Sequence, residues 1–536
     1  MKNYDDSIYF LGEWGRFQQI VFFLLCAGIM PHGFGFMSLV FLTAIPSHHC
    51  LVPEVNLSEK WYNAIIPIEV VNGNQELSRC SRYRLDVVRN LSALGLIPGE
   101  DVNLSDLEQE ACVDGWSYST DIYQSTIVSE FDLVCSDQWK QPFTSTVLLM
   151  GVLFGSFLSG QVSDRFGRKP VLFTNMALQA TFTIAETFSP SWTVFSVFIF
   201  ITGVGHCSYY LSSFVLGTEI LTGKVRLMFS SMAVCLGFAV GYMLLPLVAY
   251  FLRDWKSLLL GGSLPCLLYI PLWWFIPESP RWLLSQGRVE EAEAILRKAA
   301  KMNKVEAPRV IFEDHITHTD EAETHPEEHY NIFDLLRTKN IRNITIILFL
   351  IWITMSTGYY GLSLDSSQMH ANPYISSFLS AAVEVPAYIS AWLALRYLPR
   401  RLSFICILLL GGVSLFLIQL VPQSLSALSV ALEMLGKFGL TAGFSIVYVY
   451  TAEIYPTVLR NTAAGTLSTV ARVATCLVPF VLKLSVYFKY LPKITMGTLA
   501  VMSAFAAFFL PESFGQPLPQ TIQQMHKRGS LVPKRI

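Results

Sequence analysis

Residues 142–169 read PFTSTVLLMGVLFGSFLSGQVSDRFGRK. The first part, 142–162, is an uncharged and mostly apolar run, and the second part is a short polar segment that carries Asp164, Arg165, Arg168 and Lys169. A helix rises about 1.5 Å per residue, so a run of this length can cross the roughly 30 Å hydrocarbon core of a bilayer. An apolar run that ends in a cluster of cations predicts a membrane-spanning helix whose charged end lies in the cytoplasm.

The same pattern continues along the 536 residues of the chain, of which 52% are hydrophobic and 15% charged. Soluble domains carry about 25% charged residues, so the composition argues against a series of soluble domains. We therefore expect an all-α membrane protein with twelve transmembrane helices. Their approximate positions are 17–42, 142–162, 170–189, 193–217, 227–250, 257–276, 343–364, 374–397, 402–421, 427–450, 463–486 and 490–510.

Positive charge in alternate loops orients the spans. Basic residues gather in the loops 163–170, 218–226 and 396–401, which places both termini in the cytoplasm. The expected segments are a cytoplasmic N-terminus at 1–16, a first six-helix half at 17–276, a cytoplasmic linker at 277–342, a second six-helix half at 343–510 and a cytoplasmic tail at 511–536.

The orientation makes the long polar segment 43–141 an extracellular loop within the first half. This segment contains three N-x-S glycosylation sequons, at Asn56, Asn90 and Asn103. An even set of cysteines in an oxidising compartment predicts two disulfides, with three possible pairings. The cysteines concerned are Cys50, Cys80, Cys112 and Cys135. The sequons favour the secretory route and the plasma membrane.

The two halves repeat each other. Pro277-Glu278-Ser279 recurs as Pro511-Glu512-Ser513, and Glu219-Ile220 recurs as Glu453-Ile454; both pairs are 234 residues apart (277 to 511 and 219 to 453). Arg226 and Arg460 each follow the glutamate by seven residues. Two landmarks at one spacing indicate a duplicated six-span unit. Parallel halves of this kind build transporters that rock around a site at the middle of the membrane.

Several motifs resemble a known family. The segment 160–169, GQVSDRFGRK, is similar to the loop signature of the major facilitator superfamily, and PESPRWL at 277–283 narrows the resemblance to its organic ion and sugar porters. The cysteine-bearing loop and YTAEIYPT at 450–457 resemble the organic cation/anion solute carriers. The motifs most similar to the carnitine/organic cation branch are LGEWG at 11–15, GTEIL at 217–221 and VPAY at 385–388. The resemblance runs from about residue 4 to 525 and implies the major facilitator fold.

Acids and bases recur at the cytoplasmic ends of both halves. We expect them to form ion pairs that hold one gate shut, with topology anchoring as the alternative. The residues are Asp164, Arg165, Arg168, Glu219, Arg226, Glu453 and Arg460.

Arg472 lies in the otherwise uncharged stretch Thr466–Pro479 of the eleventh span. A cation at this depth is costly unless it faces water or a partner. Its planar guanidinium matches a carboxylate. The resemblance associates arginine at this position with anion and zwitterion carriers, which predicts a substrate with a carboxylate. The alternative is neutralisation by a protein acid such as Glu384.

Aromatic rings could hold an ammonium group by cation–π attraction. Tyr210, Trp352, Tyr359 and Tyr448 match positions that line the cavity in the resembling family. Trp352 and Tyr359 are seven residues apart and share a helix face. Packing or a place at the membrane interface is the alternative for each ring.

Other residues in the spans concern coupling and structure. His32 and Tyr209 stand where the resembling carnitine carriers have asparagine, which argues against sodium coupling and leaves proton coupling through His32, or simple packing, as alternatives. His206 is a weaker candidate. Glu433 and Lys437 are four residues apart, and we expect them to pair along one helix face.

The sequence offers no catalytic, metal or nucleic-acid site. The segment 217–224 departs from the P-loop in spacing and has Val225 where serine or threonine should follow Lys224, so we expect no ATP. No basic stripe suggests nucleic acid. We therefore expect no enzyme and no cofactor, apart from sodium or a proton as coupling ion. The expected partners are the lipid bilayer and a small organic ion.

The function we expect is alternating-access transport of small zwitterions or cations such as carnitine. The rivals are a polyspecific cation or anion carrier that does not take carnitine, and a receptor or scaffold without flux.

Overall fold

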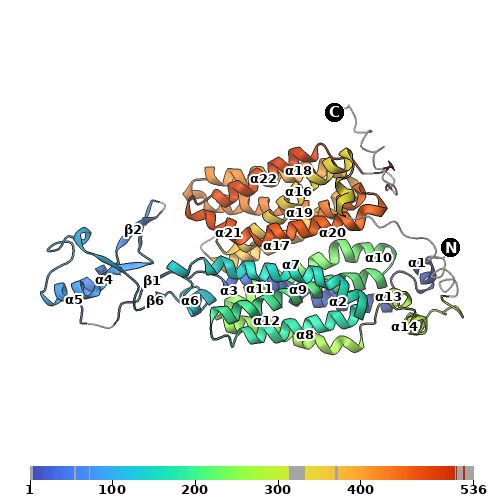
Figure 1. Ribbon diagram of the computed structural model, residues 1–536, viewed down its shortest axis with the longest axis horizontal. Coiled ribbons are helices and arrows are strands. Elements are labelled where there is room, and N and C mark those ends of the chain that lie inside the picture. The colour runs from blue at the N-terminus through green and yellow to red at the C-terminus, as the bar shows by residue number, and fades with distance from the viewer. Residues whose placement is uncertain are drawn as a thin grey trace.

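The computed structural model describes residues 4–53, 56–71, 73–312, 332–368, 372–513, 515, 519 and 523–524. The expected linker 277–342 and tail 511–536 therefore lie partly outside the described residues. Two helical bundles lie side by side, and a small domain projects from one end of the first bundle (Figure 1). We call this end of the molecule the domain-bearing end.

The first bundle contains six rods. They are α2 (Arg16–Met37) with α3 (Leu39–Leu42); α7 (Lys140–Phe166); α8 (Arg168–Glu186); α9 (Trp192–Ile220); α10 (Gly223–Met228) with η4 (Phe229–Ala233) and α11 (Val234–Phe251); and α12 (Trp255–Tyr269) with η5 (Ile270–Trp274).

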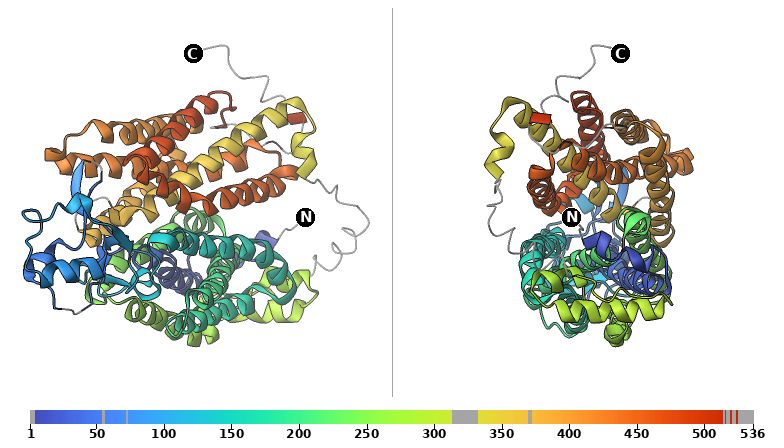
Figure 2. Two further views of the ribbon diagram at one scale, coloured as in Figure 1. Left: turned by 60° about the vertical axis from the view of Figure 1, so that its left-hand side comes forward. Right: turned by 90° about the vertical axis from the view of Figure 1, so that its right-hand side faces the viewer.

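The second bundle repeats this plan with six rods. They are α16 (Lys339–Leu364); α17 (Pro373–Tyr397); α18 (Arg400–Leu417) with η8 (Ile418–Leu420); η9 (Gln423–Leu425) with α19 (Ser426–Ile454); α20 (Thr457–Cys476) with α21 (Val478–Leu482) and η10 (Lys483–Val486); and α22 (Leu491–Ala507). Viewed along the long axis, the second bundle lies over the first (Figure 2).

Nine helices within the described residues are long and apolar enough to cross a membrane. A tenth candidate, Thr462–Cys476 with Val478–Val486, is bent by 41° next to Pro479, where proline removes a backbone donor. The shorter α22 and the polar-faced α8 complete the set of twelve rods. The predicted twelve-helix architecture is confirmed, with the eleventh span broken rather than straight.

The segment between α3 and α7 folds as a small separate domain. Its three antiparallel ribbons are β1 (His48–Cys50) with β6 (Trp116–Tyr118), β2 (Ile68–Val71) with β3 (Asn74–Leu77), and β4 (Ser81–Tyr83) with β5 (Gln109–Ala111). Its helices are α4 (Glu59–Ala64), α5 (Leu85–Ala93) and η2 (Leu104–Asp106). Two short helices lead from it to α7: α6 (Ile127–Phe131), whose Ile127 and Val128 pack against the first bundle, and η3 (Cys135–Asp137).

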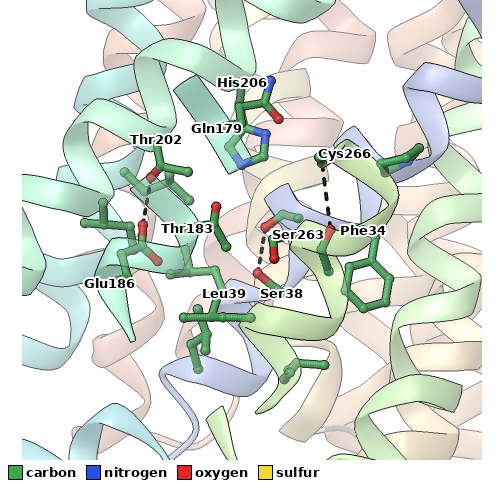
Figure 3. A pocket seen from close by; sticks show the side chains of 18 residues that line it. Phe34, Ser38, Leu39, Gln179, Thr183, Glu186, Thr202, His206, Ser263 and Cys266 are labelled. Atoms are coloured by element: carbon green, nitrogen blue, oxygen red, sulfur yellow. Dashed lines mark hydrogen bonds between the residues drawn. The ribbon is translucent and has the colours of Figure 1, made fainter. Parts of the chain in front are cut away.

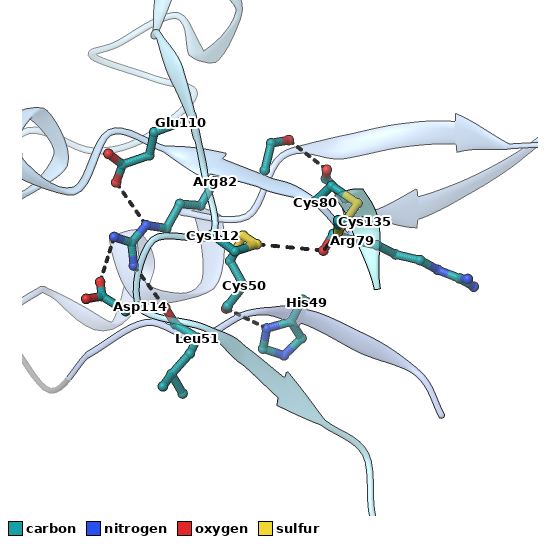
Figure 4. Close-up of a disulfide and its surroundings, with 12 residues drawn as sticks. His49, Cys50, Leu51, Arg79, Cys80, Arg82, Glu110, Cys112, Asp114 and Cys135 are labelled. Carbon is teal, nitrogen blue, oxygen red and sulfur yellow. Dashed lines mark hydrogen bonds and ion pairs between the residues drawn. A yellow bond between two sulfur atoms is a disulfide. The ribbon is translucent and has the colours of Figure 1, made fainter. Parts of the chain in front are cut away.

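Two disulfides hold this domain, and the structure selects one of the three possible pairings. Cys50 is bonded to Cys112 and Cys80 to Cys135 (Figure 4). Beside the Cys50–Cys112 disulfide the buried Arg82 reaches Glu110 at 2.9 Å and Asp114 at 2.7 Å. The side chains of the three predicted glycosylation asparagines, Asn56, Asn90 and Asn103, are exposed, which leaves them open to the predicted modification.

Short helices cover the end of the first bundle opposite the small domain (Figure 1). They are α1 (Tyr4–Ser7), η1 (Tyr9–Leu11), α13 (Pro280–Ser285) and α14 (Val289–Met302); η6 (Ile332–Leu336) precedes the second bundle. The N-terminal segment is tied to the end of α14 because Asn303 accepts a hydrogen bond from the amide of Phe17 at 2.8 Å.

The bundles are sealed against each other near the domain-bearing end. Thr146 on α7 donates to the carbonyl of Cys476 at 3.0 Å, and Tyr374 on α17 donates to the carbonyl of Ile122 at 2.7 Å. The ring of Tyr374 also stacks on Phe41. Away from this seal each bundle has its own apolar core. One end of the interface is therefore closed, as alternating access requires of either end state.

Candidate functional site

Arg472 lies on α20, which packs against α7 of the first bundle and α16 of the second. Its side chain is half-buried, and it makes no hydrogen bond or ion pair with the part of the chain that the structure describes. Its charge acts on the hydroxyls of Tyr210 on α9, Tyr360 on α16 and Tyr448 on α19. An unpaired guanidinium thus lies in the neighbourhood of three tyrosines at the seam between the bundles.

The four aromatic residues that were predicted to hold an ammonium group divide into two pairs. Tyr210 is half-buried and Tyr448 is 46% exposed, and both lie within the electrostatic reach of Arg472. Trp352 is only 1% exposed; its indole donates to Thr451 at 3.0 Å, and its ring packs edge-on to Tyr448 at 4.6 Å.

Tyr359 is also buried, and its hydroxyl donates to Glu384 at 2.7 Å. Trp352 packs in the core of the second bundle, whereas Tyr359 packs in the apolar cluster that joins the two bundles and stacks on Phe444. The neighbouring Tyr360, which the sequence argument passed over, faces Arg472 instead and contacts Phe36 of the first bundle at 6.1 Å between ring centres.

Glu384 is not the partner of Arg472. Its carboxylate lies 3.2 Å from Lys437, and both side chains are fully buried. Lys437 also donates to Ser363 and lies 4.5 Å from the ring centre of Tyr359. Within the described residues, Arg472 therefore has no acidic side chain as a partner.

The expected pair between Glu433 and Lys437 is wrong. Glu433 binds Lys493 of α22 at 3.2 Å, while Lys437 binds Glu384 of α17. The two side chains lie on one helix but turn toward different neighbouring helices, because a buried charge is stabilised most by the partner that shares its enclosed environment.

His32 packs beside the aromatic group rather than lining an open space. It is buried on α2, its Nδ1 lies 3.3 Å from Nδ1 of His206, and its ring stacks on Tyr210 at 5.5 Å. The buried Tyr209 contacts His32 at 6.1 Å between ring centres and also packs against Tyr269. The two histidines that the sequence treated separately are therefore one pair.

The predicted gate charges form ion pairs within each bundle. In the first bundle Arg168 binds Glu219 at 3.0 Å and Asp164 at 2.8 Å. Glu278 accepts from the backbone amide of Arg168 at 3.1 Å. These contacts join the start of α8 to the end of α9.

The second bundle repeats this arrangement with Arg400. Arg400 binds Glu453 at 3.1 Å, and Glu512 accepts from the backbone amide of Arg400 at 3.0 Å. From the sequence alone, no part in these contacts was predicted for Arg400, Glu278 or Glu512. The duplication offered the signal, since Arg400-Arg401 follows Arg168-Lys169 by 232 residues, two fewer than the repeat spacing of 234.

Three predicted gate residues lie outside these ion pairs. Arg226 is held by Asp5 of the N-terminal segment at 2.8 and 3.1 Å, and Arg460 donates to the carbonyl of Ala452 at 2.7 Å. Arg165 is exposed and lies over the ring of Phe166. No sequence signal pointed to Asp5.

The comparisons with known proteins agree with this architecture. The sugar (and other) transporter family model matches residues 110–525. The inward-open and the partially occluded inward-open structures of the xylose transporter XylE from E. coli each superpose with a TM-score of 0.61. The inward-open structure is 16% identical, and the match covers 95% of this chain and 99% of the xylose transporter chain. The partially occluded structure is 14% identical, and the match covers 94% of this chain and 100% of that chain. At this identity they show the fold alone, which is the predicted major facilitator fold.

Sequence relatives are much closer. The chain is 53% identical over 526 residues to mouse organic cation/carnitine transporter 2 and 52% identical over 526 residues to the human protein of that name. Each alignment covers 98% of this chain and 94% of the relative. Mouse solute carrier family 22 member 4 is 51% identical over 528 residues, covering 98% of this chain and 95% of that one.

These matches are to transporters rather than enzymes. With a family model matched over most of its length and relatives above 50% identity, the chain belongs to the sugar (and other) transporter family of membrane carriers, within solute carrier family 22.

Proposed function

We propose that this chain is an alternating-access transporter of small organic zwitterions and cations, with carnitine-like compounds as its first substrates. It acts in the plasma membrane with both termini in the cytoplasm. The domain-bearing end then faces outward, and the sealed interface at that end makes the structure an inward-facing state.

The observation that carries this proposal is the unpaired Arg472 at the seam. Glu384, the acid that could have neutralised it, is already committed to Lys437 at 3.2 Å. A half-buried cation without a partner is stabilised by an anion that enters the site, and a guanidinium binds a carboxylate with two parallel hydrogen bonds. A substrate carboxylate is the group that fits.

An ammonium group has its own place in the same site. Tyr448, Tyr210 and Tyr360 lie within the electrostatic reach of Arg472 and come from both bundles. Cation–π attraction to such faces contributes about 0.5–2 kcal/mol. A molecule with a carboxylate at one end and a quaternary ammonium at the other would therefore join the two bundles, which favours the conformational change that carries it across.

The relatives support this substrate class, since two of them are named organic cation/carnitine transporters. An inward gradient of sodium ions or protons is the driving force we propose, without ATP. The ion pairs of Arg168 and Arg400 stiffen the inner ends of the two bundles, and their rearrangement between the bundles would close the inner gate in the outward-facing state.

The test is uptake into cells that express the chain, corrected for the amount at the cell surface. Labelled carnitine, tetraethylammonium and an organic anion are compared in wild type, Arg472→Lys and Arg472→Ala, each with sodium present and replaced. We expect carnitine uptake in wild type, a loss of about tenfold or more in Arg472→Ala, corresponding to a lost charged hydrogen-bond pair, and partial retention in Arg472→Lys.

Tetraethylammonium has no carboxylate, so its uptake should depend much less on Arg472. Unchanged carnitine uptake in Arg472→Ala would contradict the assigned role of this residue. Uptake of tetraethylammonium without carnitine would instead indicate a polyspecific cation carrier, and absence of all flux would indicate a receptor or scaffold.

A further inference from the structure

A small cavity lies inside the first bundle, away from the seam, and its mostly apolar wall carries several polar side chains (Figure 3). Its volume is about 30 Å³, and it lies between α2, α3, α7, α8, α9 and α12. One face of α8 contributes Gln179, Thr183 and Glu186, spaced four and three residues apart, and α9 contributes Thr202 and His206. A helix face of this polarity inside a membrane bundle requires a reason other than packing.

Glu186 is the one acid in the wall of this cavity. It is 2% exposed, and within the described residues no lysine or arginine lies within ion-pair distance of it. Its one hydrogen-bond partner in that part of the chain is the hydroxyl of Thr202, 2.8 Å from Oε1. An ionised carboxylate in this setting would be buried without a compensating charge, which costs free energy.

The hydroxyl of Thr202 shows how the charge is removed. The same oxygen lies 2.8 Å from Glu186 and 2.9 Å from the carbonyl of Phe198. A threonine hydroxyl has one hydrogen, so it can donate to one of these oxygens only. A protonated Glu186 supplies the second hydrogen: the carboxylic acid donates to Thr202, and Thr202 donates to the carbonyl.

A second unpaired group also faces the cavity. The amide nitrogen of Gln179 donates to the carbonyl of Gly205 at 3.0 Å, which leaves Oε1 of this 1% exposed residue without a partner in the described part of the chain. A buried amide oxygen of this kind accepts from a water molecule or from a nearby acid. Gln179 therefore offers a free acceptor beside the cavity that contains Glu186.

His206 links the cavity to the transport site. It lines the cavity on one side, and on the other its Nδ1 lies 3.3 Å from Nδ1 of His32, which stacks on Tyr210 beside Arg472. Two facing Nδ1 atoms at this distance need one hydrogen between them, so one imidazole donates and the other accepts. The pair can therefore pass a proton.

We propose that Glu186 is a proton-binding site and that the His206–His32 pair joins it to the Arg472 site, which makes the chain a proton-coupled transporter. In each cycle one proton adds to the carboxylate from the outer side, and the neutral acid persists through the change of state. The same proton then leaves through the imidazoles to the inner side. Only O–H and N–H bonds form or break.

The surrounding groups leave this role to Glu186 and the two histidines. Apart from Arg472 beyond Tyr210, the charged side chains of the surrounding helices lie at the helix ends: Arg16 on α2, Lys140, Asp164 and Arg165 on α7, Arg168 and Lys169 on α8, Glu219 on α9, and Lys256 on α12. The titratable groups that lie nearer are thiols and phenols. They are Cys207, Tyr209 and Tyr210 on α9, Cys266 and Tyr269 on α12, Cys26 on α2, Cys235 on α11 and Tyr360 on α16. The inference rests on the proposed transport function for its coupling step, but not for the protonation of Glu186.

The first measurement therefore needs no substrate. Infrared spectra of the purified full chain are compared for wild type, Glu186→Gln and Glu433→Gln at neutral pH. We expect a carbonyl stretching band of a protonated carboxylic acid that disappears in Glu186→Gln only, because Glu433 is paired with Lys493. If the spectrum of Glu186→Gln lacks no carboxylic acid band that wild type shows, the assignment of Glu186 is wrong, whatever the chain transports.

The second measurement tests coupling in proteoliposomes without sodium. An inward gradient of two pH units can drive accumulation of at most about 100-fold if one proton moves with each substrate. We expect accumulation of labelled carnitine above the level at equal pH in wild type, and none in Glu186→Gln, while exchange of internal for external carnitine persists because it moves no net proton. His206→Gln should lose accumulation but keep the infrared band.

Each remaining outcome is decisive. Gradient-driven accumulation that survives in Glu186→Gln, or wild-type exchange without any response to the pH gradient, would overturn the proton coupling. Accumulation driven only by a sodium gradient would overturn it as well. A chain that keeps the infrared band but neither exchanges nor accumulates carnitine would instead contradict the proposed substrate.

Discussion

Nζ of Lys437 lies 3.2 Å from Oε1 of Glu384, and both side chains are completely buried beside the seam between the bundles. The hydroxyl of Tyr359 donates to the same carboxylate oxygen at 2.7 Å, and the ring of Tyr242 from the first bundle lies 5.6 Å from the ammonium. Tyr242 also donates to Ser366 at 3.1 Å. This pair is a charged centre at which the two bundles meet.

Removing one partner of this pair should destabilise the fold. Lys437→Met leaves a buried carboxylate and Glu384→Gln leaves a buried ammonium, and breaking such a pair typically costs about 3–5 kcal/mol. We expect the double variant to be less destabilised than the sum of the single variants, measured by thermal unfolding of detergent-purified protein. The exposed Lys489→Met is the control and should shift stability by no more than about 0.5 kcal/mol. Additive losses would contradict direct pairing.

Substitutions of Tyr448 and Trp352 should distinguish a side chain that binds the substrate from one that only packs in the core. Tyr448 is 46% exposed and faces Arg472, so Tyr448→Ala should raise the KM for tetraethylammonium by about three- to thirtyfold, matching 0.5–2 kcal/mol of cation–π attraction. Tyr448→Phe keeps the ring and should stay near wild type. Trp352→Ala, in contrast, removes a buried side chain and should lower the amount of folded protein, as measured by surface labelling. Equal KM values for Tyr448→Ala and wild type would exclude the ring from binding.

The contact between Asp5 and Arg226 should depend on pH. The hydrogen bond and charge of Arg226 lower the pKa of the Asp5 carboxyl below its ordinary value of 3.8. Because the pKa is lower in the folded state, the contact contributes fully above the ordinary value and is lost as the pH falls below it. Both groups are partly exposed, so the contribution should be below about 1 kcal/mol.

Limited proteolysis of the N-terminal segment gives the readout for this contact. Asp5→Asn should speed cleavage near residue 5 at neutral pH, while Asp6→Asn is the neighbouring control that leaves the Arg226 contact in place. The wild-type rate should approach the Asp5→Asn rate only below about pH 4. Identical cleavage of wild type and Asp5→Asn at neutral pH would show that the contact does not hold the segment.

The disulfide pairing can be mapped directly. Peptides from non-reduced protein should link Cys50 to Cys112 and Cys80 to Cys135. On intact cells Cys80→Ser should leave Cys135 open to a membrane-impermeant maleimide, because the domain lies outside in the proposed orientation. Loss of a disulfide typically costs about 2–5 kcal/mol, so surface expression should also fall. A Cys50–Cys80 peptide would contradict the structure, and labelling only after permeabilisation would contradict the orientation.

The local pattern of the sequence was enough for much of this molecule. The apolar runs predicted the membrane spans, because the thickness of the bilayer sets the length of a span. The repeat of the motif at 277 and 511 predicted two equivalent halves. An even number of cysteines gave two disulfides, but not their partners. Arg472 stood out because a lone charge in an apolar span is costly wherever the helix is placed.

Only the tertiary structure decided which groups meet. Glu433 and Lys437 are four residues apart, yet they bind Lys493 and Glu384 on other helices. His32 and His206 come together from α2 and α9, and Glu186 meets Thr202 across two helices. Periodicity fixes the face of a helix on which a residue lies, but the rotation and neighbours of that helix follow from the packing of all twelve. The pairing of buried charges therefore could not be read from the spacing along one segment.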